Sequence, residues 1–514
     1  MNHANPTVDL TAIAGELIHS LMLRPWGQVS TSVYETGRLV SLAPWLTGHQ
    51  ERIDYLIRAQ SQDGSWGAPD GYGLVPTLSA TEAILSVLGH ADPGMDHERL
   101  GAAADRGLRR LGVWLSNPLE LPDMPAIEHI VPSLVASINR RLGELPGHAP
   151  LPLPEGMSYD GLQRVSSLIG TGIEVPEKLL HALEVAGDKA GEAPGIRPTA
   201  IGTIGASPAA TAAWLRNRYA DDADGPVRNH LEAVVRLHGG PVPVGLPITV
   251  FERGWVLSWL VRAGVPVEVP PEMVADLRAA IGPDGAAAGP GLPADADTTS
   301  VALYALALVG APHEPDSLWR FRFGTNFSTW PREQGVSVTV NAHVLDAFGQ
   351  YVACRPAAAP RYEQAIAEVA AWIRDHQRPD GSWADRWHAS PYYATVSCAL
   401  ALDAFGGQAA AESVRAAVEW VLDTQRPDGS WGRWAGTAEE SAYAMQTLLL
   451  TGAGPEPRRM RAVNEGLAYL TGAAGGEHPP LWHDKDLYVP LAVARAAMIA
   501  AAYLARRVQL SSWP

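Results

Sequence analysis

Two aspartates separated by a single residue, Asp295 and Asp297, are the strongest candidates for chemistry in the sequence. They precede the apolar run 301–308, which predicts a helix that begins close to them. One aspartate would suffice as the helix N-cap, whereas a second carboxylate here suggests a pair in which one group keeps its proton because its neighbour is charged. A helix N-terminus also stabilises the anion left after proton donation. The residues alone are therefore compatible with a capped helix or with a proton-donating acid.

A repeated phrase organises the elements around this acid pair. The pattern Gln…Asp-Gly-Ser-Trp occurs at residues 60–66, 377–383 and 425–431, and a degenerate Pro-Asp-Gly copy occurs at 283–285. The last two full copies start 48 residues apart, a period typical of stacked helical hairpins. Because the phrase recurs at equivalent positions, we expect a structural role, in which Gln caps a helix end and Trp locks the turn, instead of a catalytic one.

Helical periodicity precedes each full copy of the phrase. Apolar residues recur at i, i+3 and i+4 within residues 53–60, 366–373 and 414–422. Asp-Gly then supplies a turn, since glycine tolerates a positive φ, and no alternating strand pattern stands out anywhere. We therefore predict an all-α protein of helical hairpins, arranged as two α/α barrels.

Length and composition indicate a large folded protein. The 514 residues are 46% hydrophobic and 18% charged, which excludes extensive disorder. The net charge of −16 argues against nucleic acid or an anionic membrane as a partner, and an anionic substrate would need a local basic cluster. Two cysteines, Cys354 and Cys398, are too few for a disulfide framework. With neither a secretory signal nor an apolar run long enough to span a bilayer, we expect a cytoplasmic protein of undetermined oligomeric state.

The acid pair and the repeats together resemble the motifs of one enzyme family. Asp295-Ala-Asp297-Thr-Thr resembles the DxDD acid motif of class II terpene cyclases, and the Gln…Asp-Gly-Ser-Trp copies resemble their QW motifs. Further similar segments follow in the family's order along most of the chain: residues 33–36, 124–134, 180–184, 207–213, 251–255, 340–343, 387–395, 437–443 and 482–488. The ordered set is similar to the diphosphate-processing branch of the family and not to the triterpene cyclases.

This resemblance implies two α-barrel domains, named γ and β, with the active site in the cleft between them. The γ-like domain would comprise residues 25–238, inserted after the first helix of a β-like domain formed by residues 1–24 and 239–514. The implied reaction is the protonation-initiated cyclisation of a linear isoprenoid diphosphate that keeps its diphosphate. The expected substrate is geranylgeranyl diphosphate, giving a bicyclic labdane- or clerodane-type diphosphate. The alternative is farnesyl diphosphate, giving a drimenyl-type product.

The acid motif implies roles for its members. By motif position Asp297 is the general acid and Asp295 orients it. An alkene is a very weak base, so the acid must lie in a dry cavity with a stabilised conjugate base. The fourth motif position is Thr298 in place of the family's aspartate, which removes one charge but leaves a hydroxyl that can hydrogen-bond the acid. Asn341 and His343 are candidates for further hydrogen bonds to the acid region, with a purely structural role as the alternative.

Carbocations need an apolar wall that is rich in electrons. Aromatic faces supply it through cation–π attraction worth about 1–2 kcal/mol each. The candidates, each of which has core packing as an equal alternative, are Trp387, Tyr392, Tyr393, Phe251 and Trp255.

Binding the diphosphate requires local positive charge on this acidic chain. Lys485, within the family-like segment 482–488, is the first candidate, followed by Arg386 and Arg433. The resemblance also implies Mg²⁺ bound together with the diphosphate, and Glu128 matches a family glutamate as a ligand.

The end of the reaction is less well defined by the resemblance. His181 matches the histidine that forms a water-holding base with an asparagine in plant relatives, but Val244 or a neighbour stands at the asparagine's position. The terminating base is therefore left open, and a rearranged product is compatible with the sequence. A class I synthase would need DDxxD and NSE motifs. Residues 221–225 lack the fifth-position aspartate and no NSE is present, so we do not expect the chain to ionise its own product.

Three other functions are compatible with helical hairpins. A glycoside-processing barrel would use Asp295 and Asp297, but inverting carboxyl groups lie about 6.5–9.5 Å apart across a sugar, and the surroundings here are apolar. A subunit like those of protein prenyltransferases would need an Asp/Cys/His zinc site. A non-catalytic scaffold would leave the doubled aspartate and the ordered motifs unexplained.

Overall fold

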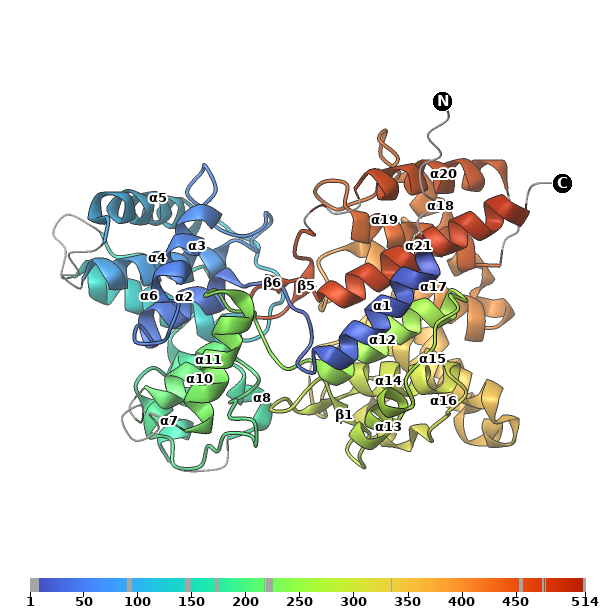
Figure 1. The fold of residues 1–514 in the computed structure, drawn as a ribbon, viewed down its shortest axis with the longest axis horizontal. Coiled ribbons are helices and arrows are strands. Elements are labelled where there is room, and N and C mark those ends of the chain that lie inside the picture. Colours follow the sequence, from blue (N-terminus) through green and yellow to red (C-terminus); the bar gives the residue numbers. More distant parts are fainter. Residues whose placement is uncertain are drawn as a thin grey trace.

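The computed structural model describes residues 9–89, 95–143, 149–171, 175–216, 218, 225–333, 335–452, 456–473, 476 and 478–511. It is a mainly helical molecule with two lobes (Figure 1). We call the helices α2–α11 the N-lobe, and α1 together with α12–α21 the C-lobe. The aspartate-rich residues 221–224 lie outside the described residues.

The N-lobe consists of short and medium helices. They are α2 (Val33–Leu42), α3 (His49–Ala59), α4 (Leu74–Leu88), α5 (His97–Leu115), α6 (Ile127–Leu142), α7 (Asp160–Gly170), α8 (Glu177–Leu180), the 3₁₀-helix η1 (Leu183–Ala186), α9 (Lys189–Glu192), α10 (Pro208–Leu215) and α11 (Pro226–His238). Helices α2, α4, α6, η1 and α10 contact one another in turn and close a ring, with α3, α5, α7, α9 and α11 packed against that ring.

The C-lobe repeats this arrangement on a larger scale. Its helices are α1 (Leu10–Leu23), α12 (Thr249–Arg262), α13 (Pro271–Ala280), α14 (Ala296–Leu308), η2 (Pro315–Phe321), α15 (Val338–Cys354), η3 (Pro356–Ala358), α16 (Ala359–Asp375), α17 (Pro391–Phe405), η4 (Gln408–Ala410), α18 (Ala411–Asp423), α19 (Ala438–Leu450), α20 (Pro457–Gly472) and α21 (Leu491–Ser511). Contacts run α12–α14–α15–α17–α19–α21 and back to α12, and α1, α13, α16, α18 and α20 pack outside. The prediction of an all-α protein with two α/α barrels is confirmed.

The difference between inner and outer helices follows from their sequences. Inner helix α14 is apolar on every side and almost wholly buried, because it has helical neighbours all around it. Outer helix α18 buries one stripe, formed by Val414, Ala417, Val418, Val421 and Leu422, and exposes the opposite face. This is the stripe that the periodicity predicts.

Strands are few within the described residues. Three antiparallel pairs of two residues each are present: β1 (Ala286–Ala287) with β2 (Ala294–Asp295), β3 (Arg322–Phe323) with β4 (Asn326–Phe327), and β5 (Trp482–His483) with β6 (Leu487–Tyr488). The β5–β6 hairpin lies where the lobes meet (Figure 1). There Leu481 and Leu487 pack with Tyr72, Met124 and Ala389, so one small apolar cluster joins the lobes.

The repeated phrase has the structural role that we expect from its recurrence. The tryptophan, however, and not the glutamine, bonds to the helix end, and the glutamine holds the turn. Trp431 Nε1 donates to the carbonyl of Val421 at 2.7 Å, so Trp satisfies the end of the preceding helix. Gln425 Nε2 donates to the carbonyls of Gly429 at 3.0 Å and Ala462 at 2.9 Å, and thereby ties the turn to the next outer helix. The other two full copies repeat both contacts.

The first helix belongs with the C-terminal part of the chain. Helix α1 contacts α12 and α21, and the N-lobe therefore follows α1 in sequence and precedes α12. The described part of the chain contains no helix with the length and apolar character needed to cross a membrane.

Candidate active site

A cavity of about 420 Å³ lies between the lobes. Its walls come from residues within 123–129 and 178–182 of the N-lobe, and within 248–251, 288–298, 329–333, 386–387 and 482–488 of the C-lobe. Asp295, Asp297 and Thr298 are among the lining residues, so the acid motif faces this cavity.

The β1–β2 hairpin places the acid motif at the start of α14. Asp295 ends β2 in an extended conformation and is the N-cap of α14, accepting a hydrogen bond from the backbone N–H of Thr298 at 2.6 Å. Gly285, with φ of +102°, turns the chain before β1, and a Cβ there would lie 2.6 Å from Thr299 Oγ1. The hairpin can approach the helix so closely only because this residue is a glycine.

Burial and like charge act together on the acid pair. Burial, followed by the negative charge of Asp297, raises the pKa of Asp295 to about 7, while hydrogen bonds from the Thr298 backbone and side chain oppose the rise. Two such close carboxyl groups titrate as a pair. The pair therefore holds one proton up to about neutral pH, as its sequence spacing predicts.

His343 of α15 contacts the acid directly. Its Nδ1 lies 2.6 Å from Asp297 Oδ1, a hydrogen bond that the sequence prediction anticipates. Asn341 does not join it. The Asn341 amide accepts from the backbone of Phe327 at 2.8 Å and donates to the carbonyls of Phe327 at 2.9 Å and Ser337 at 2.8 Å. Its hydrogen-bonding capacity is used to hold β4 against α15, so the structural alternative applies to Asn341.

Only some of the predicted aromatic residues face the cavity. Phe251 and Trp387 line it. Trp255 stacks behind Phe251, with ring centroids 4.1 Å apart, and Tyr393 accepts a hydrogen bond from Trp255 Nε1 at 2.9 Å. Tyr392 packs on Trp420 in the C-lobe core. Trp255, Tyr392 and Tyr393 are therefore core residues that support the wall and do not form it.

Three further aromatic residues line the cavity and were not predicted: Trp330, Trp482 and Tyr488. Trp482 meets Phe251 edge to face at 5.6 Å, so the two rings form one wall. Trp482 and Tyr488 belong to the family-like segment 482–488, and that signal in the sequence was available to find them.

Lys485, predicted to bind the diphosphate, is among the residues that line the cavity, but its charge is already paired with carboxylates. Its side chain is 0% exposed, and its ammonium pairs with Glu35 and with Glu184 at 2.9 Å. It also donates to Ser207 Oγ at 2.8 Å and to the His181 carbonyl at 2.7 Å. Burial lowers the pKa of Lys485, but the surrounding carboxylates outweigh it and raise the pKa overall. Lys485 is thus a buried structural cation.

The two predicted arginines also have partners. Arg386 lines the cavity, but it forms ion pairs with Glu333 at 2.7 Å and Asp123 at 3.1 Å, so its charge is already balanced. Arg433 is not among the lining residues. It donates to the Ala389 carbonyl at 2.7 Å and pairs with Asp70 at 3.3 Å, which joins the lobes outside the cavity.

Lys178 is the cation that sequence reasoning missed. It is exposed, lines the cavity and forms no ion pair with any described residue. The chain has only three lysines, Lys178, Lys189 and Lys485, and Lys178 lies just before the family-like segment 180–184. Scarcity and position together were the signal available in the sequence.

His181 lines the cavity, and both of its ring nitrogens lie within hydrogen-bond distance of an oxygen. Its Nδ1 lies 2.6 Å from the Gly205 carbonyl oxygen and its Nε2 lies 2.8 Å from Asp484 Oδ1. Burial lowers the pKa of His181, but Asp484 and the two hydrogen bonds raise it overall. Because both ring nitrogens are engaged in these hydrogen bonds, the arrangement gives no support to the role of terminating base that the resemblance implies for His181. Val244 is buried, and the dyad is incomplete.

The one residue predicted to bind a metal ion, Glu128, offers a carboxylate whose Oε1 lies 3.4 Å from His129 Nε2. Glu128 lines the cavity with its side chain 64% exposed. The residues that the structure describes contain no group of three or more His, Cys, Asp or Glu placed to hold a metal ion. Mg²⁺ often uses one or two protein carboxylates and takes its other ligands from substrate phosphates and water. Glu128 fits that mode of binding and not a site made by protein alone.

Comparison with known proteins identifies relatives of this chain in both sequence and structure. A family model described as the squalene-hopene cyclase C-terminal domain matches residues 334–483. The chain is 41% identical over 498 residues to the ent-copalyl diphosphate synthase of Streptomyces sp. strain KO-3988, covering 95% of both chains. It is 40% identical to the copalyl diphosphate synthase of Streptomyces cyslabdanicus, covering 97% of this chain and 96% of the relative. The solved ent-copalyl diphosphate synthase of Streptomyces platensis matches with a TM-score of 0.92 and 44% identity, covering 97% of this chain and 99% of the other.

Proposed function

The chain belongs to the class II diterpene cyclases, and we propose that it cyclises geranylgeranyl diphosphate to a bicyclic labdane-type diphosphate in the cavity between its lobes. The observation that carries this proposal is the position of Asp297, which opens into an aromatic-lined cavity while His343 holds it from behind. Relatives named copalyl diphosphate synthase support the C20 substrate over the C15 alternative.

The first step is a proton transfer from Asp297 to the terminal alkene of the substrate. The carboxyl O–H bond breaks, the proton adds to one alkene carbon, and the cation forms on the other. Two internal alkenes then attack in turn, so that each forms one new ring bond. Loss of one proton from carbon ends the reaction, and the diphosphate C–O bond stays intact. Proton gain and loss balance, and the product is an isomer of the substrate.

The cavity walls suit this sequence of cations. Phe251, Trp482 and Trp387 line the same cavity as Asp297, in which the positive charge develops. Each ring face supplies about 1–2 kcal/mol of cation–π stabilisation in a desolvated site. Burial and like-charge repulsion from Asp297 raise the pKa of Asp295, and hydrogen bonds from Thr298 oppose the rise, so the acid pair retains a proton.

The diphosphate is assigned to the N-lobe wall. Lys178 supplies an unpaired positive charge there. Glu128 would hold Mg²⁺ together with the diphosphate oxygens, and the ion would neutralise phosphate charge when bound. We also propose that residues 25–238 form the inserted γ-like domain, which the packing of α1 on α12 and α21 supports, and that the enzyme acts in the cytoplasm.

Incubation of the purified protein with C15 and C20 diphosphates and Mg²⁺ tests this function. After phosphatase treatment, mass spectrometry should detect a cyclic alcohol from geranylgeranyl diphosphate only. Linear alcohols alone from both substrates would reject the proposal, and a cyclic product from the C15 substrate alone would reassign the enzyme to that chain length.

Replacing Lys178 with glutamine should raise the KM for geranylgeranyl diphosphate about tenfold and leave kcat within about twofold. A charge-assisted contact to phosphate is worth roughly 1.5–3 kcal/mol, and part of this is screened at an exposed site. Steady-state kinetics at constant Mg²⁺ measures both constants. Lys189→Gln is the matched control, since Lys189 is exposed but does not line the cavity, and its KM should not change. An unchanged KM in Lys178→Gln would place the diphosphate elsewhere.

A further inference from the structure

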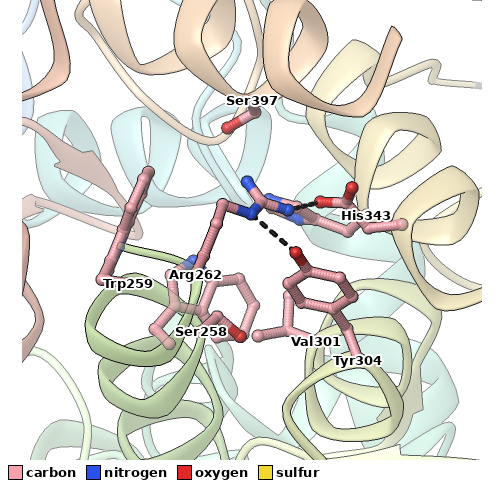
Figure 2. Close-up of a pocket in the computed structure, with 9 residues that line it drawn as sticks. Ser258, Trp259, Arg262, Val301, Tyr304, His343 and Ser397 are labelled. Atoms are coloured by element: carbon pink, nitrogen blue, oxygen red, sulfur yellow. Dashed lines mark hydrogen bonds and ion pairs between the residues drawn. The ribbon is translucent and has the colours of Figure 1, made fainter. Parts of the chain in front are cut away.

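A second, small pocket lies behind His343. It holds about 20 Å³ between α12, α14, α15 and α17, and is lined by Trp255, Ser258, Trp259, Arg262, Val301, Tyr304, His343, Asp346 and Ser397 (Figure 2). His343 lines this pocket and Asp297 lines the large cavity. The imidazole therefore lies between the large cavity that contains the acid and the charged side chains of the small pocket.

The small pocket contains one buried ion pair. Arg262 extends from α12 across the pocket and pairs with Asp346, and its Nε donates to the Tyr304 hydroxyl at 2.7 Å (Figure 2). The Asp346 side chain is 3% exposed. Burial raises the pKa of Asp346, while the charges of Arg262 and His343 oppose the rise. Burial lowers the pKa of Arg262, but Asp346 and Tyr304 raise it overall. Arg262 carries a full positive charge in this pocket.

Asp346 acts on the same imidazole that holds the acid. It lies three residues after His343 on α15, so both side chains share one face of the helix. Asp346 Oδ2 pairs with Arg262, but Oδ1 has no hydrogen-bond partner among the described residues and is buried. Without Arg262, a bare carboxylate would therefore stand beside His343 in a nonpolar setting.

The proton between His343 and Asp297 has two possible positions. It can stay on the carboxyl group, leaving a neutral imidazole, or move to the ring, leaving a carboxylate. Only the first form can protonate an alkene. An unbalanced negative charge at Asp346 would stabilise the imidazolium and favour the second form, since charges interact strongly in a desolvated interior.

We propose that Arg262 is a positioning residue that keeps the shared proton on Asp297 by neutralising Asp346, an inference that rests on the proposed function. The other groups around His343 do not replace it. Trp255 of α12 and Tyr393 of α17 meet the imidazole edge to face, at 5.4 Å and 6.4 Å, and Tyr304 of α14 lines the same pocket. Burial raises the pKa of Tyr304 to about 12 and also raises that of Tyr393, so both stay neutral. With the proton on Asp297, Asp346 is the anion next to His343 and Arg262 is the cation that balances it.

Four variants test the charge argument. Arg262→Gln should lower kcat about 100-fold with KM within about twofold, because Arg262 lines the small pocket and not the cavity proposed to hold the substrate. Arg262→Gln combined with Asp346→Asn should recover most of the lost kcat, since no charge is then unbalanced. Arg262→Lys keeps the charge and should stay within about fivefold of the wild type. Arg253→Gln is the matched control, because Arg253 lies on the same helix and pairs with Asp276 away from His343.

The pH profile separates charge placement from simple loss of structure. In Arg262→Gln the acid can be active only when both His343 and Asp297 hold protons, so the optimum should move to lower pH, and the double variant should restore it. A damaged fold would reduce activity at every pH without moving the optimum.

Several outcomes would overturn the proposal. If Arg262→Gln keeps the wild-type kcat, Arg262 does not control the shared proton. If the double variant is no faster than Arg262→Gln, the loss of activity is not caused by an unbalanced charge at Asp346. If Arg262→Gln does not fold, Arg262→Lys and the double variant still test the proposal. A slow Arg262→Lys variant, or a double variant that folds but is inactive, would contradict the neutralisation of Asp346 by Arg262. An inactive wild type would instead reject the proposed function itself.

Discussion

Asp297→Asn is expected to reduce turnover of geranylgeranyl diphosphate by about 10³-fold or more. A positioned general acid contributes roughly 10²–10⁴-fold, and an alkene has almost no basicity with which to find another donor. The amide is nearly isosteric and keeps a group beside His343 Nδ1, so the fold should persist. Single-turnover product formation by mass spectrometry, with thermal unfolding as a check on structure, measures both effects.

Two controls make this result specific to the acid. Asp284→Asn removes an exposed carboxylate whose one ion-pair partner among the described residues is exposed Arg320, and it should leave turnover unchanged. Asp295→Asn should instead retain part of the activity, because it alters the neighbour and not the donor. Substantial product from Asp297→Asn, combined with none from Asp295→Asn, would assign the donor to Asp295.

The pH dependence of turnover follows from the same pair. Because the pKa of Asp295 is raised to about 7, the pair carries its shared proton below that pH and loses it above. Activity should therefore fall as pH rises through about 7. In Asp295→Asn the like charge is gone, so the remaining carboxyl group gives up its proton more readily and the fall should begin at lower pH.

Lys485→Met is expected to lower the free energy of unfolding by about 3–5 kcal/mol, as loss of one partner from a buried ion pair does. The change leaves Glu35 and Glu184 buried without their cation, whereas the wild-type ammonium satisfies both. Denaturant titration followed by circular dichroism should show the transition at lower denaturant. Because the chain has two lobes, the shift of the first transition is the quantity to compare.

Companion variants distinguish a structural cation from a substrate ligand. Lys189→Met makes the same change at an exposed lysine and should not alter stability. Adding Glu35→Gln and Glu184→Gln to Lys485→Met should recover part of the lost stability, because whole buried charge networks are often replaceable where single members are not. A stable Lys485→Met with a raised KM would return Lys485 to the diphosphate site.

Local sequence was sufficient to predict the helices and the position of the aspartate pair. Helical periodicity depends on side chains within a few residues of one another, and so does N-capping by Asp295. The spacing of Asp295 and Asp297 places both carboxyl groups at one helix start, and their mutual effect follows from that spacing. The repeated phrase also predicts its own structural role, because its contacts lie within one hairpin and the next helix.

Tertiary structure alone decided which of several similar side chains offer an unpaired charge or an aromatic ring to the cavity. Lys485 and Lys178 are both near family-like segments, yet Lys485 is neutralised by Glu184, 301 residues away, and Lys178 is left free to bind an anion. Phe251 faces the cavity while Trp255, one helical turn later, lies behind it. Both outcomes depend on residues from distant parts of the chain. Burial by such residues determines the charge and the direction of a side chain, and its neighbours in sequence do not determine either.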